Sequence, residues 1–227
     1  MKNNNLKTAI ILGATGLVGG LVLQLLLEDD RYEKVIVFSR RSCGVKHAKL
    51  EEYIVDLFNL EVSSGRFKAD VVFCCVGTTK AKTPDQDMYT KVDYGIPVMA
   101  AQMCKRSNIN TFIVVSALGA HVNSSVFYSR LKGDMERDVL AQKIENTFLL
   151  QPSLIAGNRE EKRLGESLAK WVMRVINPLL IGKLKKYQSI EPETIARAMV
   201  WLDNNIYKEN RIPSDKIKSI ANLNDRN

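Results

Sequence analysis

Three residues of the chain have the types and spacing to move a proton. Tyr128 and Lys132 are four positions apart, so on a helix they share one face, and Ser116 precedes Tyr128 by twelve positions. A phenol with a reference pKa of about 10 is a poor acid or base at neutral pH, but a nearby ammonium favours the phenolate. Lys132 would supply that charge, and Ser116 could donate to an oxygen on which negative charge develops. The alternative is that these residues have no catalytic role: Tyr128 and Lys132 would be a surface pair, and Ser116 would simply end a strand.

A glycine-rich turn lies near the start of the chain. Residues 13–20 read Gly-Ala-Thr-Gly-Leu-Val-Gly-Gly, after a short apolar run at 8–13 and before an apolar helical pattern at 17–27. Backbone amides in such a turn can approach a pyrophosphate at a helix N-terminus, where larger side chains would collide. The turn lies between a strand and a helix, as in the dinucleotide-binding fingerprint, but its glycine spacing is GxxGxxG and not GxGxxG. Tight packing of the helix on the strand would explain the glycines without a ligand.

A second apolar run, residues 34–38, is followed by Ser39, Arg40 and Arg41. An NAD site usually has a carboxylate here, which binds the ribose hydroxyls. Guanidinium groups form charge-assisted contacts with a 2′-phosphate instead, so we expect NADP, with NAD as the less favoured cofactor. Two solvated loop arginines are the alternative.

Alternating strands and helices must position these residues. Strands are expected at 8–13, 34–38, 51–56, 69–76, 111–116 and 146–151, and helices at 17–27, 94–105 and 126–142. This alternation predicts an α/β fold with a doubly wound parallel sheet, the Rossmann fold. The glycine turn and Ser116 then both follow strands at the carboxyl edge of the sheet.

The last third of the chain has a different pattern. Helices are expected at about 164–176 and 191–203, separated by an irregular basic stretch at 182–189. Because no linker or repeat interrupts the chain, we expect a single domain over residues 1–227. Residues from about 153 to 227 would form a small helical extension on the substrate side of this domain.

Composition narrows the class of protein. The 227 residues carry a net charge of +8, but the basic residues are scattered and not interleaved with aromatic ones, so no nucleic-acid partner is expected. No apolar run approaches the roughly 18 to 20 residues that span a bilayer. The polar start of the chain lacks the features of a secretory signal, so we expect a cytoplasmic protein.

The metal-binding and redox side chains suggest no site of their own. Four cysteines without CxxC spacing are expected to be reduced and structural, and the adjacent Cys74 and Cys75 should point to opposite faces of a strand. His47 and His121 lack metal-ligand spacing, so no metal site is expected.

Together these residues resemble the short-chain dehydrogenase/reductase superfamily, whose Ser, Tyr and Lys triad matches Ser116, Tyr128 and Lys132. The match is closest to an atypical branch, the Tat-interacting-protein oxidoreductase group and its bacterial relatives, and covers about residues 7–203. An ordered set of motifs carries it: GATGLVG at 13–19, CVGTT at 75–79, VSALGA at 115–120, FYSRLKG at 127–133 and QPS at 151–153.

The resemblance implies a cofactor site built from most of these motifs. Its expected members are Gly13, Thr15, Gly16, Leu17, Val18 and Gly19 in the turn, Ser39, Arg40 and Arg41 at the 2′-phosphate, Asp56 and Leu57 beside the adenine, Cys75, Val76, Gly77, Thr78 and Thr79 along the cofactor, Tyr128 and Lys132 at the ribose, and Pro152, Ser153 and Ile155 near the nicotinamide. One position departs from the family. Many relatives have an asparagine in the helix after the fourth strand, where this chain has Asp93, so a proton relay through that position is not carried over.

These features favour an NADP-dependent oxidoreductase that transfers a hydride between nicotinamide and a small carbonyl or alcohol substrate. The alternative from another class is a nucleotide-sensing regulatory or interaction protein with weak or no catalysis. A nucleotide-sugar epimerase is the third interpretation, but such enzymes usually need a larger C-terminal domain than the roughly 70 residues available here. The oligomeric state stays open, a homo-oligomer included.

Overall fold

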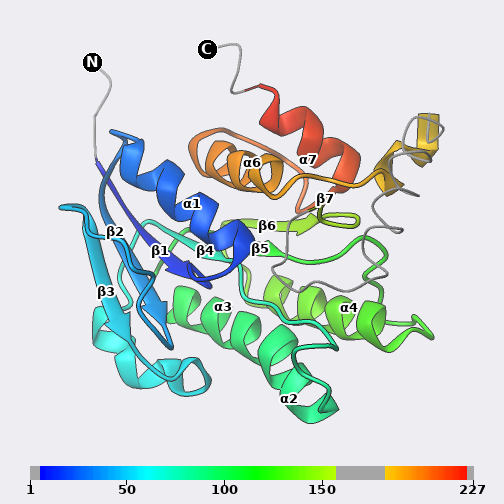
Figure 1. Cartoon of the computed structure of the whole chain (residues 1–227), viewed down its shortest axis with the longest axis horizontal. Helices are drawn as coiled ribbons and strands as arrows, with labels where there is room; N and C mark the ends of the chain where they lie inside the picture. The colour runs from blue at the N-terminus through cyan, green and yellow to red at the C-terminus, as the bar shows by residue number, and fades with distance from the viewer. Residues whose placement is uncertain (1–5, 157–181, 224–227) are drawn as a thin grey trace.

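The computed structural model describes residues 6–156 and 182–223, and all of its strands belong to one parallel sheet (Figure 1). In the order β3-β2-β1-β4-β5-β6-β7, the strands are Leu50–Ile54, Tyr32–Ser39, Lys7–Leu12, Val71–Cys74, Thr111–Val115, Asn146–Gln151 and Arg211–Pro213. Neighbouring strands pair in parallel throughout. The order reverses between β1 and β4, the switch point at which doubly wound sheets bind ligands. The predicted fold class is confirmed.

Helices cover both faces of this sheet (Figure 1). The helices are α1 (Leu17–Glu28), α2 (Gln86–Thr90), α3 (Ile96–Arg106), α4 (Phe127–Leu140), α6 (Pro192–Asn204) and α7 (Ser214–Ala221), with a π-helical segment η2 (Lys91–Gly95) and the 3-10 segments η1 (Leu57–Arg66) and η4 (Gly182–Tyr187). Helices α1, α6 and α7 pack on one face, and α3 and α4 pack on the other. Two apolar layers result, one on each side of the sheet.

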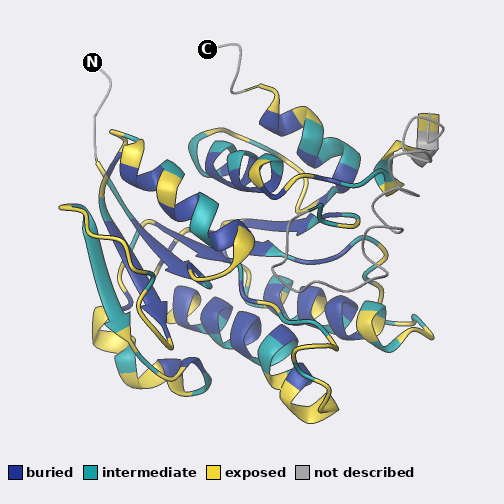
Figure 2. Cartoon of the chain, in the orientation of Figure 1, coloured by how far each residue is buried: buried dark blue, intermediate teal, exposed yellow. Residues whose placement is uncertain are grey.

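The central strands are largely buried (Figure 2), and their residues alternate between these two layers. Ala9 and Ile11 of β1 join the layer of α1 and α6, whereas Ile10 and Leu12 join the layer of α3 and α4. This alternation explains why the strands read as continuous apolar runs in the sequence, since both of their faces are buried. At the end of β4, Cys74 and Cys75 contact opposite layers, as predicted, and both are free thiols.

The C-terminal part departs from the expected purely helical extension. Strand β7 pairs with β6 and adds a seventh strand to the sheet, and α7 follows it directly. β7 has only three residues and ends in Pro213, so it has too little periodicity to be detected from the sequence. The helix predicted at about 164–176 lies outside the described residues. Among the helices that are described, none is long and apolar enough to cross a membrane.

Candidate functional site

Two loops meet at the switch point, at the carboxyl ends of β1 and β4. The Cys75 amide donates to the Leu12 carbonyl at 2.8 Å. Gly13 adopts φ +89°, and a Cβ there would lie 2.8 Å from the Cys75 carbonyl carbon. Gly19 of α1 is equally constrained, because its Cβ would lie 2.2 Å from the Gly13 oxygen. Close packing, the explanation that needs no ligand, therefore accounts for these two glycines.

The middle of the turn remains open. Thr15, Gly16 and Leu17 are exposed, whereas Val18 is buried in the core. Gly16 is the N-cap of α1 in an extended conformation; no described side chain caps this helix, and its first turn holds no acidic residue. The first amides of an uncapped helix present partial positive charge. This end of α1 therefore fits an anionic group such as a pyrophosphate.

The loop after β2 presents two guanidinium groups to solvent. Ser39 is buried and donates to the Arg41 carbonyl at 2.6 Å, which fixes the start of the loop. Arg40 and Arg41 are exposed, and within the described part of the chain their side chains make no hydrogen bond or ion pair. They are therefore available to a phosphate from solvent.

The two residues expected beside the adenine behave differently. Asp56 is exposed and accepts the Phe58 amide at 3.0 Å, so it caps η1. Leu57 is buried in the layer of α3 and α4. Contact of either residue with an adenine stays a prediction.

One face of α4 carries three chemically important residues, Tyr128, Lys132 and Glu136, each one helical turn after the last. Tyr128 is 39% exposed, and the Tyr89 ring of α2 meets it edge-on with centroids 6.3 Å apart. Lys132 and Glu136 are buried. Tyr128 and Lys132 therefore share one face of α4, as predicted. The phenol is accessible to solvent and the ammonium is buried.

Lys132 is engaged by Asp93 of η2. Its Nζ lies 3.0 Å from Asp93 Oδ1 and 3.4 Å from the Asp93 carbonyl oxygen. The other carboxylate oxygen of Asp93 accepts the Thr78 amide at 2.8 Å. The side chains of Lys132 and Asp93 are only 3% and 2% exposed. Asp93 therefore connects the loop after β4 to the predicted catalytic lysine.

Ser116 has a partner that the sequence analysis missed. Its hydroxyl donates to Glu136 Oε1 at 2.6 Å, and the same carboxylate accepts from Gln151 at 2.8 Å and from Arg211 of β7 at 2.7 Å. A hydroxyl has one proton, so in this geometry Ser116 presents lone pairs to the site and not the donor expected for a substrate carbonyl. Extending the four-residue spacing from Lys132 to Glu136 would have found the carboxylate; nothing local pointed to Arg211.

The segment after β6 is tied to the C-terminal part of the chain. The Pro152 carbonyl accepts the Leu118 amide at 2.9 Å, and the Ser153 hydroxyl bonds to the Gln188 carbonyl and lies 3.0 Å from Ser214 Oγ. Ile155 forms an isolated parallel bridge with Ile190. Approach of Pro152, Ser153 and Ile155 to a nicotinamide stays a prediction.

The loop after β4 approaches the buried ion pair at Gly77 and Thr78. Val76 is buried, Thr79 is partly buried, and the Thr78 hydroxyl lies 2.8 Å from that of Thr83. A Cβ on Gly77 would lie 3.5 Å from Asp93 Oδ1. The structure thus brings together the turn after β1, the loop after β4 and the inner face of α4.

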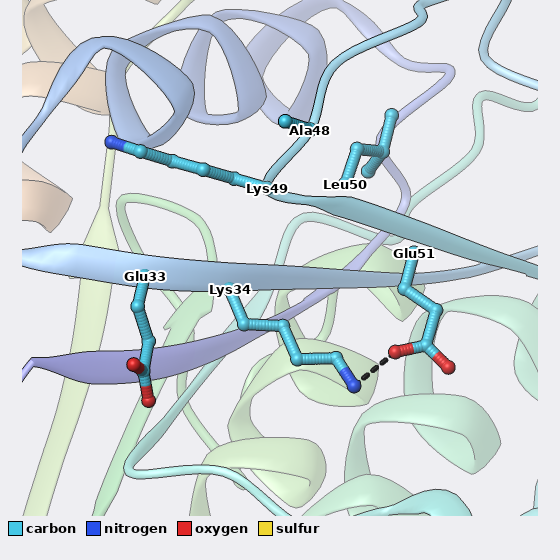
Figure 3. A pocket seen from close by; sticks show the side chains of 6 residues that line it. All are labelled: Glu33, Lys34, Ala48, Lys49, Leu50 and Glu51. Carbon is cyan, nitrogen blue, oxygen red and sulfur yellow. Dashed lines mark ion pairs between the residues drawn. The ribbon is translucent and has the colours of Figure 1, made fainter.

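A separate pocket opens at the starts of β2 and β3, away from this edge (Figure 3). It is lined by Glu33, Lys34, Ala48, Lys49, Leu50 and Glu51. Lys34 and Glu51 form an ion pair across it. No predicted site residue lines the pocket, so it does not compete with the carboxyl edge as a cofactor site.

Comparisons with known proteins show the family to which the chain belongs. Residues 13–173 match the profile of a family described as NAD(P)H-binding. The protein named "Protein FMP52, mitochondrial" of Eremothecium gossypii is 33% identical over 74% of this chain and 76% of its own length. A protein of the same name from Meyerozyma guilliermondii is 34% identical over 85% of this chain and 84% of its own. The chain therefore belongs to the NAD(P)H-binding family, and a nicotinamide cofactor follows from that membership.

Solved structures confirm the fold at low sequence identity. An ADP-L-glycero-D-manno-heptose-6-epimerase from Helicobacter pylori superimposes with a TM-score of 0.67 at 16% identity, covering 98% of this chain and 84% of the epimerase. The UDP-glucose 4-epimerase of Thermotoga maritima gives 0.65 at 16% identity, covering 95% and 82%. These two likenesses confirm the predicted fold, the doubly wound parallel sheet.

The expected cytoplasmic location is contradicted. The relatives from Eremothecium gossypii and Meyerozyma guilliermondii are both named mitochondrial. Mitochondrial targeting segments are amphipathic, rich in Arg and Ser and poor in acidic residues, so the lack of an apolar signal core says nothing about that organelle.

Proposed function

We propose that the chain is an NADP-dependent oxidoreductase that reduces a small carbonyl compound or oxidises the corresponding alcohol. One observation carries the proposal: a continuous set of contacts joins the turn after β1 to Lys132, which lies one helical turn from Tyr128. Gly13 abuts Cys75, the same loop continues to Thr78, and Thr78 bonds Asp93, which pairs with Lys132 one turn from Tyr128. An anion-binding helix start and an acid-base phenol therefore share one edge of the sheet.

The residues of the site divide the work. The first amides of α1 and the Arg40 and Arg41 guanidiniums bind the phosphates. The reduced nicotinamide, when bound, supplies the hydride. Tyr128 donates a proton to the carbonyl oxygen as that oxygen gains negative charge. Ser116, held by Glu136, offers lone pairs that accept a hydrogen bond from the hydroxyl of the product alcohol.

The preference for NADP rests on Arg40 and Arg41, which replace the usual carboxylate. Hydrogen bonds to charged groups contribute about 1.5 to 3 kcal/mol, so Arg40→Ala should weaken NADPH binding about 10- to 150-fold and leave NADH nearly unchanged. Titration calorimetry with both nucleotides measures this. Arg106→Ala is the control, since Arg106, the last residue of α3, pairs with Glu61 of η1. Equal affinities of the wild-type protein for NADPH and NADH would contradict the preference.

The turn after β1 offers a matched pair of variants. Gly16→Val should remove nucleotide binding and leave the fold intact, because Gly16 has an extended backbone and, among the described residues, its Cβ would meet the Gly13 oxygen alone, at 3.2 Å. Gly19→Ala should instead disrupt folding, because its Cβ would overlap that oxygen. Circular dichroism and calorimetry separate the two. Native structure with unchanged affinity in Gly16→Val would place the pyrophosphate elsewhere.

Activity is tested by mixing the protein with NADPH and a panel of aldehydes and ketones, and following the loss of reduced-nicotinamide absorbance. We expect at least one substrate to be turned over. If none is reduced and nucleotide changes the affinity for a protein partner, the regulatory alternative replaces the enzyme.

A further inference from the structure

Asp93 is an ionisable residue at the centre of the site to which neither the triad nor the family match assigns a role. It lies in η2, the π-helical segment between α2 and α3. Single π-helical turns within α-helices occur frequently at functional sites. Both of its carboxylate oxygens are used: Oδ1 faces Lys132 Nζ at 3.0 Å, and Oδ2 accepts the Thr78 amide at 2.8 Å. These two contacts fix its position from both sides.

The pair with Lys132 is shielded from solvent. With side-chain exposures of 2% and 3%, neither group can exchange its partner for water without local opening. At such burial the attraction between unit charges is stronger than at the surface. The ammonium that was expected to favour the Tyr128 phenolate is therefore matched by a carboxylate at contact distance, and its field at the phenol is reduced.

We propose that Asp93 is a positioning residue, which holds the Lys132 ammonium against the loop after β4 and offsets its charge, so that Tyr128 stays protonated at neutral pH and acts as the proton donor in carbonyl reduction. This inference rests on the proposed function. It adds what keeps Tyr128 in the protonated form that can donate, which the triad alone does not specify. A neutral phenol can donate to a carbonyl oxygen, whereas a phenolate can only accept from an alcohol.

The other ionisable groups near the pair do not replace Asp93 as the countercharge of Lys132. Burial raises the pKa of Cys74 of β4 to about 11, so this thiol is neutral near pH 7. Burial, followed by the charge of Asp93, raises the pKa of Tyr89, which is neutral as well. Glu136 is occupied by Ser116, Gln151 and Arg211. Further groups on the neighbouring elements include Lys91, which is exposed, Tyr94, which donates to Asp138, and His121, which accepts the Asn123 amide.

The direct test is an ultraviolet titration of the free protein. Subtracting the tyrosinate absorbance of Tyr128→Phe from that of wild type isolates the ionisation of Tyr128. The same subtraction in an Asp93→Asn background removes the countercharge and keeps an acceptor for Thr78. We expect the midpoint of Tyr128 to fall by about one pH unit or more, the shift typical of an opposite charge nearby. An unchanged or higher midpoint would overturn the proposal.

Two further variants serve as a control and as a substitute for Asp93→Asn. Asp138→Asn removes a negative charge from the same helix, where Asp138 accepts the Tyr94 hydroxyl at 2.7 Å, and it should leave the Tyr128 midpoint unchanged. If Asp93→Asn does not fold, Asp93→Ser, which is smaller and can still accept the Thr78 amide, should lower the midpoint in the same direction. A midpoint in Asp93→Ser equal to that of wild type also counts against the proposal.

Turnover separates this inference from the proposed function. Where a carbonyl substrate is found, the high-pH limb of its reduction should move to lower pH in Asp93→Asn by the same amount as the titration midpoint. If no carbonyl is reduced, the proposed function fails, and the titration still decides the role of Asp93. If reduction occurs and neither the midpoint nor the limb moves, only the inference about Asp93 fails.

Discussion

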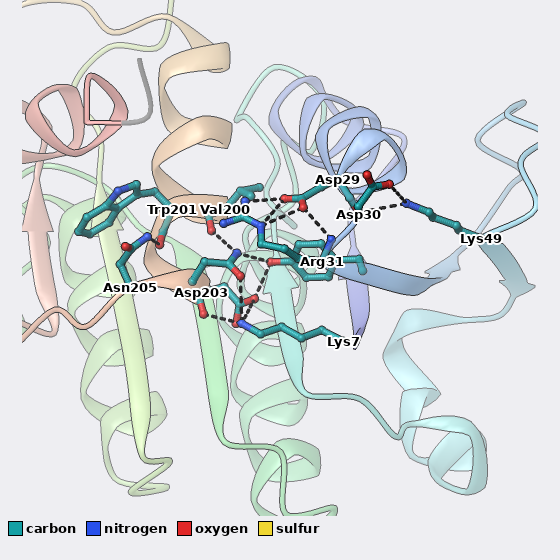
Figure 4. Close-up of polar contacts among 11 residues, drawn as sticks. Lys7, Asp29, Asp30, Arg31, Lys49, Val200, Trp201, Asp203 and Asn205 are labelled. Atoms are coloured by element: carbon teal, nitrogen blue, oxygen red, sulfur yellow. Dashed lines mark hydrogen bonds and ion pairs between the residues drawn. The ribbon is translucent and has the colours of Figure 1, made fainter. Parts of the chain in front are cut away.

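Two aspartates pair with lysines at opposite ends of the same sheet. Asp203, in the last turn of α6, meets Lys7 at 3.0 Å and accepts the Tyr32 hydroxyl at 2.5 Å, at the starts of β1 and β2 (Figure 4). Asp93 meets Lys132 at 3.0 Å beyond the carboxyl ends of the strands. Both carboxylates are 2% exposed, so burial of the acid alone does not distinguish them.

The two lysines differ in their surroundings. Lys7 is 29% exposed and donates to the side chain and carbonyl of Asp203 and to the side chain of Asn204. These hydrogen bonds join β1 to α6. None of these residues belongs to the predicted site. Lys132 is buried, is bonded to a residue that also holds the loop after β4, and lies one turn from an accessible phenol. We therefore expect the amino-end cluster (Lys7, Tyr32, Asp203 and Asn204) to stabilise the fold. We expect the carboxyl-end cluster (Asp93, Tyr128 and Lys132) to serve the proposed chemistry, because parallel sheets bind ligands at their carboxyl edge.

The sharpest test of this contrast is Tyr128→Phe, which keeps the ring and removes the hydroxyl. Loss of a general acid should lower turnover about 100- to 10,000-fold, with nucleotide affinity and thermal stability nearly unchanged. Steady-state kinetics on a substrate from the carbonyl panel, with calorimetry for the nucleotide, measures both effects. Turnover as fast as wild type would show that the carboxyl-end cluster is not catalytic.

Lys132→Met should be costly to stability as well as to activity. Within the described residues, it leaves the buried Asp93 carboxylate with the Thr78 amide as its partner, and breaking a buried pair costs about 3 to 5 kcal/mol. Nucleotide affinity should fall too if the lysine contacts the ribose. Urea unfolding gives the stability, and the double variant Asp93→Asn, Lys132→Met should recover part of the loss. No recovery would mean that the pair is not the origin of the cost.

Tyr32→Phe probes the amino-end cluster. It removes a hydroxyl that donates to Asp203 and accepts from Asn204 at 2.7 Å. The free energy of unfolding should fall by about 1.5 to 3 kcal/mol, the range for hydrogen bonds to charged groups. Nucleotide affinity and turnover should not change, because the cluster lies at the other end of the sheet. A drop in NADPH affinity without unfolding would break the separation of roles.

Lys7→Met should have the smallest effect. Lys7 is partly solvated, so its pair is closer to a surface salt bridge, with a contribution of about 1 kcal/mol or less. Asp203 also keeps the Tyr32 hydroxyl when Lys7 is lost. Urea unfolding in low and high salt measures the difference. A loss as large as that of Lys132→Met would remove the distinction between the two lysines.

The sequence determined the elements whose signal is local. The strand expected at 146–151 is β6, Asn146–Gln151, and the helix expected at 17–27 is α1, Leu17–Glu28. Continuous apolar runs and helical periodicity identify such elements, because burial on one or both faces is written into neighbouring residues. The three-residue β7 lies below that threshold, and only its pairing with β6 makes it a strand.

For the site, the sequence determined the spacing of Tyr128 and Lys132 and the open turn at Gly16, since helix geometry and a glycine turn follow from adjacent residues. Only the tertiary structure decided how the charges are matched. Asp93 precedes Lys132 by 39 positions, and Arg211 follows Glu136 by 75. Whether a buried charge lies beside an opposite one depends on which distant segments come together at the edge of the sheet. Hydrophobic periodicity is a local pattern, so it does not predict such contacts.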